Sequence, residues 1–200
     1  LIRSNRVRAR SHRTKKRDMA TKATILKAEL MISDMNRHYY QTHQLTVAQH
    51  PSETEERLMV RLVAFALHAS ESLAFTKGIS TEDEPDIWDK DLTDHIITWI
   101  DLGQPEDKRI RKACGRADEV FIYTYQPRNA GPWFAKAAET LSRFDKLNII
   151  AIDTVSATTL ADLCDRNMTL QCNIQDDAVY LSNESKEVEL KLTVTKAAVK

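Results

Sequence analysis

The sequence predicts one α/β domain of the α+β kind, with a mixed central β-sheet flanked by helices. Apolar and polar residues alternate near both ends of the chain, strand-like and helical segments alternate in the middle, and 200 residues suffice for one large domain. The hydrophobic content of 42% is typical of a globular protein. No apolar run approaches the roughly 18 residues that a membrane span needs, so we expect no membrane partner.

The first 18 residues differ from the rest in charge. They hold eight Lys/Arg and one acid, with no apolar stretch typical of a secretory signal and too few apolar residues to fold alone. We interpret residues 1–18 as a disordered basic extension and residues 19–200 as the domain. Two roles stay open for the extension: an upstream segment that adds nothing to the domain, or an arm that binds nucleic acid. The remainder has 21 Lys/Arg and 28 Asp/Glu, a net charge near −7.

The N-terminal part of the domain predicts a hairpin followed by a helix. Residues 22–32 alternate as in a half-buried strand, a turn follows, and residues 39–49 are expected to pair back. Ser52 is the expected N-cap of the helix, with Glu55 completing a capping box. The helix carries an apolar stripe at helical spacing, formed by Leu58, Met59, Leu62, Val63, Ala66 and Leu67.

Strands and helices alternate in the middle of the chain, which predicts parallel strand pairs. After a short strand at 73–76 and an acidic loop region at 78–94, the expected elements are a strand at 95–102, a helix ending near 117, a strand at 119–125, a second helix and a strand at 147–152. A short helix at 156–164 then precedes antiparallel strands at 169–174, 179–181 and 188–194. The sheet is therefore expected to be mixed.

Acidic residues at a strand end are the main candidates for chemistry. Alternation puts Trp99 and Asp101 on one side of their strand, at the end where the chain leaves for a helix. Asp86 is expected to supply a second carboxylate from a neighbouring short strand. Converging carboxylates suit Mg²⁺ or Mn²⁺, so we expect Asp86 and Asp101 to be metal ligands.

A basic helix follows Asp101 directly. Lys108 and Lys112 lie one turn apart on the same face of this helix, among Arg109 and Arg111. A lysine near a metal-bound water and a phosphate could orient the nucleophile and stabilise the developing charge. Ion pairs on the helix surface are the alternative explanation for these bases.

The order of these motifs resembles that of the YaeQ family. The resemblance extends from Met19 to the C-terminal strands, and it rests on Pro85-Asp86, on Asp101-Leu102-Gly103-Gln104-Pro105, on the basic helix after them and on the segment from His50 to Leu58. The family is similar in fold to the restriction-endonuclease-like, or PD-(D/E)XK, superfamily. The resemblance implies a nuclease site acting on DNA or RNA, with Asp86 and Asp101 at the two acidic motif positions and Glu53 or Glu56 as a third acid.

One motif position departs from the superfamily pattern. The lysine expected two residues after Asp101 is Gly103 in this chain. Either its function has moved to Lys108 or Lys112, with help from Gln104, or the site is eroded and the protein is a non-catalytic module that binds protein or nucleic acid. Glu53 and Glu56 have a structural alternative too, as favourable acids near a helix N-terminus.

The remaining reactive side chains indicate no second site. Cys114, Cys164 and Cys172 have neither zinc-site spacing nor an even number, which favours a reducing, cytoplasmic location and a role as small buried residues. No HExxH or Gly-rich phosphate loop occurs. Trp99 and Trp133 fall on apolar patterns and are expected in the core.

Overall fold

The computed structural model describes residues 22–81 and 83–199, which form two mixed β-sheets. The five-stranded sheet has the order β10-β9-β8-β1-β2, and the six-stranded sheet has the order β11-β7-β6-β5-β4-β3. The first contains β1 (Thr24–Asp34), β2 (Tyr39–Gln49), β8 (Asn167–Gln175), β9 (Ala178–Ser182) and β10 (Glu187–Leu190). The second contains β3 (Ala74–Phe75), β4 (Ile87–Lys90), β5 (Ile96–Leu102), β6 (Ala117–Thr124), β7 (Leu147–Ile152) and β11 (Leu192–Lys196).

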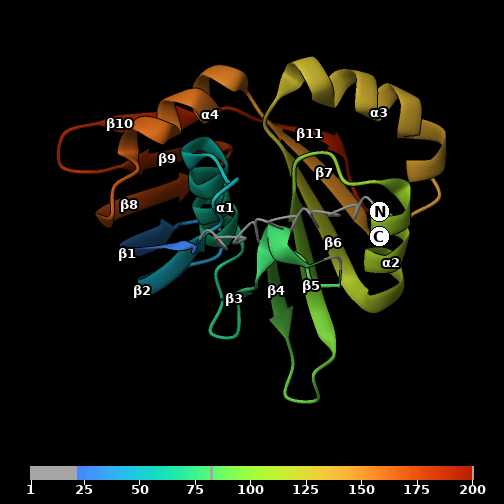
Figure 1. Cartoon of the computed structure of the whole chain (residues 1–200), viewed down its shortest axis with the longest axis horizontal. Helices are drawn as coiled ribbons and strands as arrows, with labels where there is room; N and C mark the ends of the chain where they lie inside the picture. The colour runs from blue at the N-terminus through green and yellow to red at the C-terminus, as the bar shows by residue number, and fades with distance from the viewer. Residues whose placement is uncertain (1–21, 82, 200) are drawn as a thin grey trace, which may run out of the picture.

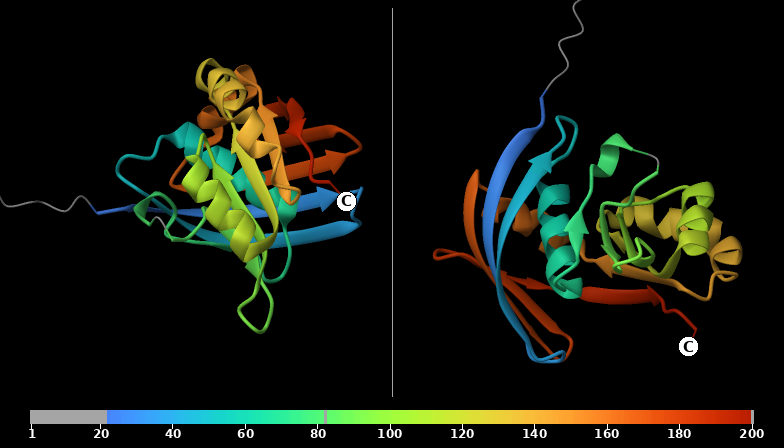
Figure 2. Two further views of the ribbon diagram at one scale, coloured as in Figure 1. Left: turned by 90° about the vertical axis from the view of Figure 1, so that its right-hand side faces the viewer. Right: turned by 90° about the horizontal axis from the view of Figure 1, so that it is seen from below.

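Helices form separate layers on the sheets. They are α1 (Glu55–His68), α2 (Asp107–Arg116), α3 (Pro127–Leu141) and α4 (Thr154–Leu160), with short 3-10 turns η1 (Gly78–Ser80) and η2 (Ala161–Leu163). In Figure 1, α1 lies between the two sheets, and α2 and α3 lie beyond the six-stranded sheet. Figure 2 shows the five-stranded sheet curving around α1. No described helix is long and apolar enough to cross a membrane.

The main core surrounds α1. Every residue from Leu58 to Ala66 on this helix is buried, as expected for a helix with a sheet on either side. A second apolar cluster lies between the six-stranded sheet and the layer of α2 and α3, and Trp99 is fully buried in it. Arg61 is the charged residue in this buried run. It is only 3% exposed, and because a buried charge is costly it needs an acidic partner.

Three parallel strands place the candidate site. β5, β6 and β7 are parallel, while β4 runs antiparallel to β5. The chain leaves β5 for α2 and leaves β6 for α3, so the C-terminal ends of these strands share one edge of the sheet. Functional groups in such sheets commonly occupy this edge, and Asp101 lies there next to the last residue of β5.

The mixed α+β class is confirmed, but the single central sheet is not. Residues 188–194 were expected to form one strand, and they divide at Lys191 between β10 in one sheet and β11 in the other. Lys191 leaves both ladders because its carbonyl accepts from the backbone N–H of Asp153 and its N–H donates to Ser156 Oγ. Uninterrupted alternation contains no information about such a change of sheet.

The N-cap of α1 also differs from the expected one. Thr54, not Ser52, precedes the helix, and its Oγ1 accepts from the backbone N–H of Arg57 at 3.2 Å. Ser52 instead bonds the ring of His50, and Glu55 becomes the first helical residue, so the capping box is absent. Both hydroxyl residues suit a cap, and the later start leaves Glu53 before the helix, where it meets Arg57 and Arg61.

Candidate functional site

Asp86 is tied to β5 on either side of Asp101. Its backbone N–H donates to the carbonyl of Ile100 at 3.0 Å, and its Oδ2 accepts from the N–H of Leu102 at 2.9 Å. The residue is 3% exposed. Gly78 passes so close that a Cβ on it would stand 3.1 Å from Asp86 Oδ1, and its φ of +53° also favours glycine. Asp86 is therefore held in one place by backbone on two sides.

Asp101 is a buried carboxylate of β5 itself. It is 2% exposed, and Trp99, two residues earlier, donates its indole N–H to Oδ2 at 3.0 Å. Arg109 of α2 adds Nε to Oδ2 at 2.8 Å and Nη2 to Oδ1 at 2.7 Å. Burial raises the pKa of the Asp101 carboxyl, the bonds from Arg109 oppose this shift, and the charge of Asp86 adds to it.

Arginines from α1 neutralise the other acids. Arg57 Nη2 donates to both oxygens of Asp86, at 2.7 and 2.8 Å, while its Nη1 donates to Glu53 at 2.8 Å. Arg61 Nη2 donates to the second Glu53 oxygen at 3.0 Å. Burial lowers the pKa of Arg61, whereas the pKa of Arg57 is raised because Asp86 and Glu53 outweigh its burial. Three carboxylates thus meet three guanidinium groups.

An open pocket of about 590 Å³, called here the acidic pocket, is bounded by two of these pairs. Its wall includes Arg57, Asp86, Asp101 and Arg109. It also includes Gln104 and Thr81, and among the described residues Gln104 Nε2 and Thr81 Oγ1 are buried atoms without a hydrogen-bond partner. Such atoms are rare in folded proteins and indicate that a polar ligand or solvent completes the site. The remaining lining residues are Gly78, Ile79, Leu102 and Pro105.

The two helix acids named from the sequence have different surroundings. Glu53 is 6% exposed, and both of its oxygens bind the arginines that reach Asp86 and the core. Glu56 is half-buried, which raises the pKa of its carboxyl, and no hydrogen bond or ion pair joins it to another described residue. Neither acid lines the acidic pocket, although Glu53 shares Arg57 with Asp86.

Lys108 and Lys112 line a neighbouring pocket of about 420 Å³ together with Asp83, Glu106 and Arg109. Lys112 pairs with the exposed carboxylate of Asp83, and Lys108 has no partner within the part of the chain that the structure describes. The base of α2 that enters the acidic pocket is Arg109, which separates the two pockets.

Sequence reasoning missed the arginines as site residues. Arg57 and Arg61 follow Glu53 at intervals of four residues, which is the spacing of ion pairs along a helix. Arg61 also interrupts an otherwise apolar stripe, and a charge on a buried face requires an acid nearby. These two signals could have identified the network, whereas nothing in the sequence distinguishes Arg109 from the other bases of α2.

The cysteines are unpaired, as expected from their number. Cys172 is fully buried, which raises the pKa of its thiol to about 12, and partial burial raises those of Cys114 and Cys164 to about 11. All three are therefore protonated near neutral pH and poor nucleophiles.

Comparisons with known proteins agree on one family. The family model described as "YaeQ protein" matches residues 19–192. "Uncharacterized protein YaeQ" of Salmonella typhi is 42% identical over 175 residues, covering 88% of this chain and 97% of the relative, and that of Escherichia coli K12 is 41% identical with the same coverage. The crystal structure of YaeQ protein from Xanthomonas axonopodis pv. citri superposes with a TM-score of 0.84 at 45% identity, covering 88% of this chain and 99% of the other. That of YaeQ protein from Pseudomonas syringae has a TM-score of 0.83 at 32% identity, covering 88% and 97%.

Proposed function

The chain belongs to the YaeQ family, and we propose that it is a cytoplasmic, Mg²⁺-dependent phosphodiesterase that hydrolyses DNA or RNA in the acidic pocket. The observation that carries the proposal is the placement of Asp86 and Asp101, two almost fully buried carboxylates, on the wall of one open pocket. Burial and the charge of Asp86 raise the pKa of Asp101, and a buried carboxylate with a raised pKa in a cleft is a candidate for chemistry. The unpaired thiols support a reducing compartment.

The carboxylates fit Mg²⁺ in their chemistry. Among the described residues no group of three or more His, Cys, Asp or Glu side chains could hold a metal ion. Mg²⁺ does not need one, since proteins usually hold it through one or two carboxylates, several waters and the phosphates of the substrate. Asp86 and Asp101 would be the protein ligands, and Mn²⁺ could replace Mg²⁺ in the same oxygen set.

The arginines have to change partners for this to happen. All four oxygens of Asp86 and Asp101 accept N–H bonds, chiefly from Arg57 and Arg109. A metal ion and a phosphodiester carry opposite charges, so with both bound the carboxylates would hold the metal and the guanidinium groups of Arg57 and Arg109 would hold the phosphate. With one Mg²⁺ and one phosphodiester bound, the site of two carboxylates and two guanidinium groups would carry a net charge of +1 instead of zero, and this change of only one unit limits the electrostatic cost of the exchange.

Each residue then has a task. Arg57 and Arg109 hold the phosphate oxygens, because a guanidinium matches phosphate geometry. Gln104 Nε2 and Thr81 Oγ1, which have no partner among the described residues, donate hydrogen bonds to the same group. Mg²⁺, when bound, supplies a more acidic water and stabilises charge on the phosphate. Lys108 and Lys112, next to the pocket, neutralise neighbouring phosphates along the strand.

This assignment follows the PD-(D/E)XK resemblance with one substitution. Asp86 and Asp101 take the two acidic positions, while the lysine position is Gly103. Gly103 has a φ of +90°, a conformation that a lysine would adopt only with strain. We therefore assign the cationic role to Arg109, which already binds Asp101, rather than to Lys108 or Lys112.

A second candidate is a module of the same fold that binds nucleic acid or a protein without catalysis. The observation that favours it is again Gly103, together with the direct pairing of both pocket carboxylates with arginine. In that case the pairs persist in the bound state and the metal never enters.

A cleavage assay separates the two candidates. Single- and double-stranded DNA and RNA are incubated with wild type, Asp86→Asn, Asp101→Asn and the matched control Asp118→Asn, an exposed acid of β6 outside the pocket. We expect cleavage that requires Mg²⁺ or Mn²⁺, is lost in both pocket variants and is retained in the control. Binding by the wild type without any cleavage would support the second candidate, and cleavage that survives both pocket substitutions would contradict the proposed site.

A further inference from the structure

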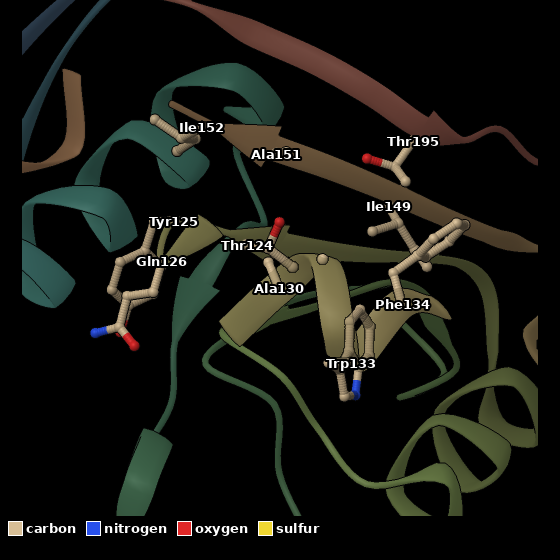
Figure 3. Close-up of a pocket in the computed structure, with 11 residues that line it drawn as sticks. Thr124, Tyr125, Gln126, Ala130, Trp133, Phe134, Ile149, Ala151, Ile152 and Thr195 are labelled. Carbon is tan, nitrogen blue, oxygen red and sulfur yellow. The ribbon is translucent and has the colours of Figure 1, made fainter. Parts of the chain in front are cut away.

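A further pocket lies at the edge of the six-stranded sheet where β6 and β7 end. It has a volume of about 210 Å³ and is called here the aromatic pocket, because Tyr125, Trp133 and Phe134 line it. It lies beneath α3 and includes Ile149 of β7 and Thr195 of β11. Figure 3 shows Trp133 and Phe134 near Ile149 at one end and Tyr125 with Gln126 at the other. Trp133 and Phe134 are only partly buried, so the expected core role of Trp133 is incomplete.

A hydrogen bond joins the linings of the aromatic and acidic pockets. The indole N–H of Trp133 donates to the carbonyl of Pro105 at 3.2 Å, and Pro105 lines the acidic pocket. The backbone N–H of Gly103 donates to the carbonyl of Tyr123 at 2.8 Å, two residues before Tyr125. The segment after β5 therefore lines the acidic pocket through Gln104 and Pro105 and contacts Trp133, which lines the aromatic pocket.

Tyr125 follows β6, and charged groups around the acidic pocket influence its phenol. Its phenol interacts with the charges of Arg57, Glu56, Asp86 and Glu53, although it lines the aromatic pocket. Burial raises the pKa of Tyr125, so the hydroxyl is protonated near neutral pH and can donate a hydrogen bond. The geometric links between the two pockets are the bond of Trp133 to Pro105 and that of Gly103 to Tyr123.

We propose that the aromatic pocket holds an unpaired nucleobase of the strand whose phosphate enters the acidic pocket, so that the substrate is single-stranded nucleic acid or a strand end. This inference rests on the proposed function, because it takes a phosphodiester to be the ligand next door. A nucleobase is flat, stacks on aromatic rings and carries polar atoms along its edge. The pocket supplies the rings of Trp133 and Phe134, and the hydroxyls of Thr124 and Thr195 can meet the edge.

The geometry disfavours a continuous duplex as the ligand. A base inside a duplex is stacked and paired, so entering a pocket under α3 requires that it leave the helix. A single strand already exposes its bases and avoids that step. No base-specific pattern is apparent, because the lining is mainly apolar, and we expect little sequence preference.

Binding to a strand with and without bases tests the inference. Fluorescence anisotropy is measured in Mg²⁺ with labelled oligothymidylate and with an abasic strand of the same length, both built with hydrolysis-resistant phosphorothioate links. Wild type should bind the thymidylate strand about tenfold more tightly, in line with the usual worth of one stacked base. Trp133→Leu should lose this preference while keeping its affinity for the abasic strand.

Two further variants complete the design. Trp88→Leu is the matched control, a partly buried tryptophan on β4 that does not line the pocket, and it should keep the preference. Gly131 lines the pocket, and a Cβ added to it would meet nothing within 4 Å, so we expect Gly131→Leu to narrow the pocket and also to abolish the preference. Equal binding of both strands by wild type overturns the base pocket alone, whereas failure to bind either strand overturns the proposed function with it.

Discussion

Arg109 on α2 donates two hydrogen bonds to the carboxylate of Asp101 on β5, from Nε to Oδ2 at 2.8 Å and from Nη2 to Oδ1 at 2.7 Å. The same guanidinium reaches the carbonyl of Glu84 at 2.7 Å. One side chain therefore joins the basic helix, the buried strand and the loop before β4. Because Asp101 is 2% exposed, this pairing also compensates a charge that water cannot reach.

Removing Arg109 should destabilise the fold. Arg109→Ala leaves Asp101 buried without its cation, so we expect the free energy of unfolding to fall by about 3 kcal/mol. The matched control is Arg111→Ala, an exposed base on the same helix without a hydrogen bond or ion pair in the described chain, which should change stability by less than about 0.5 kcal/mol. Urea unfolding at neutral pH measures both, and equal effects would show that the Asp101 pairing contributes nothing special.

Glu53 and Glu56, the two acids near the start of α1, should also differ in how much their removal destabilises the fold. Glu53→Ala leaves Arg61 unpaired in the core and removes one of the two partners of Arg57, so a loss of about 3 kcal/mol is expected. Glu56→Ala removes a half-buried acid that binds no described residue and should cost less than about 1 kcal/mol. Thermal and urea unfolding of the two variants make the comparison. A larger effect at Glu56 would contradict the network as described.

Gly103 provides a test of backbone strain without steric interference. Nothing lies within 4 Å of a Cβ placed on Gly103, but its φ of +90° penalises any side chain, so Gly103→Ala should cost about 1 to 2 kcal/mol. Gly115 of α2 has equally open space and no positive φ, and Gly115→Ala should add about 0.5 to 1 kcal/mol through helix propensity. Urea unfolding should therefore show a lower free energy of unfolding for Gly103→Ala and a higher one for Gly115→Ala. Gly103→Lys, which puts a lysine at the position where the proposed PD-(D/E)XK motif would have one, should share the loss.

His68 should contribute to the acid sensitivity of the fold. Its Nε2 lies 2.7 Å from the hydroxyl of Tyr123, and burial lowers the pKa of the imidazole from 6.5 to about 3. A depressed pKa means that the unfolded chain binds the proton more readily, so the contribution is complete above pH 6.5 and is lost as the pH falls toward 3. His68→Gln cannot titrate and can still bond Tyr123. As the pH falls from 6.5 to 4, the free energy of unfolding should therefore decrease more in wild type than in His68→Gln. A difference between the two proteins that does not change with pH would refute the assignment.

Local patterns predicted much of the fold from the sequence. The bounds of β2 and β7 were predicted to the residue, because each run of strand-forming residues ends in turn signals or a helix cap. The alternation that placed Trp99 and Asp101 on one face is confirmed by their hydrogen bond. These properties depend on neighbours along the chain, which a sequence shows directly.

Properties that depend on distant contacts could not be predicted in the same way. The division of the expected sheet depends on which ladder accepts the residues after Lys191. The pairing of Arg57 with Asp86 joins residues 29 positions apart, and no periodicity relates them. The basic segment 1–18 lies outside the described residues, so its proposed roles remain predictions.

Calorimetric titration of Mg²⁺ tests the central claim most directly. Wild type, Asp86→Asn and the control Asp118→Asn are titrated in the presence of a hydrolysis-resistant phosphorothioate strand, because the proposed function requires a phosphate to draw the arginines away from the carboxylates. We predict one Mg²⁺ site in wild type and control and its loss in Asp86→Asn. Absence of metal binding by the wild type, or unchanged binding by Asp86→Asn, would contradict the assignment of Asp86 and Asp101 as the ligands of a catalytic metal.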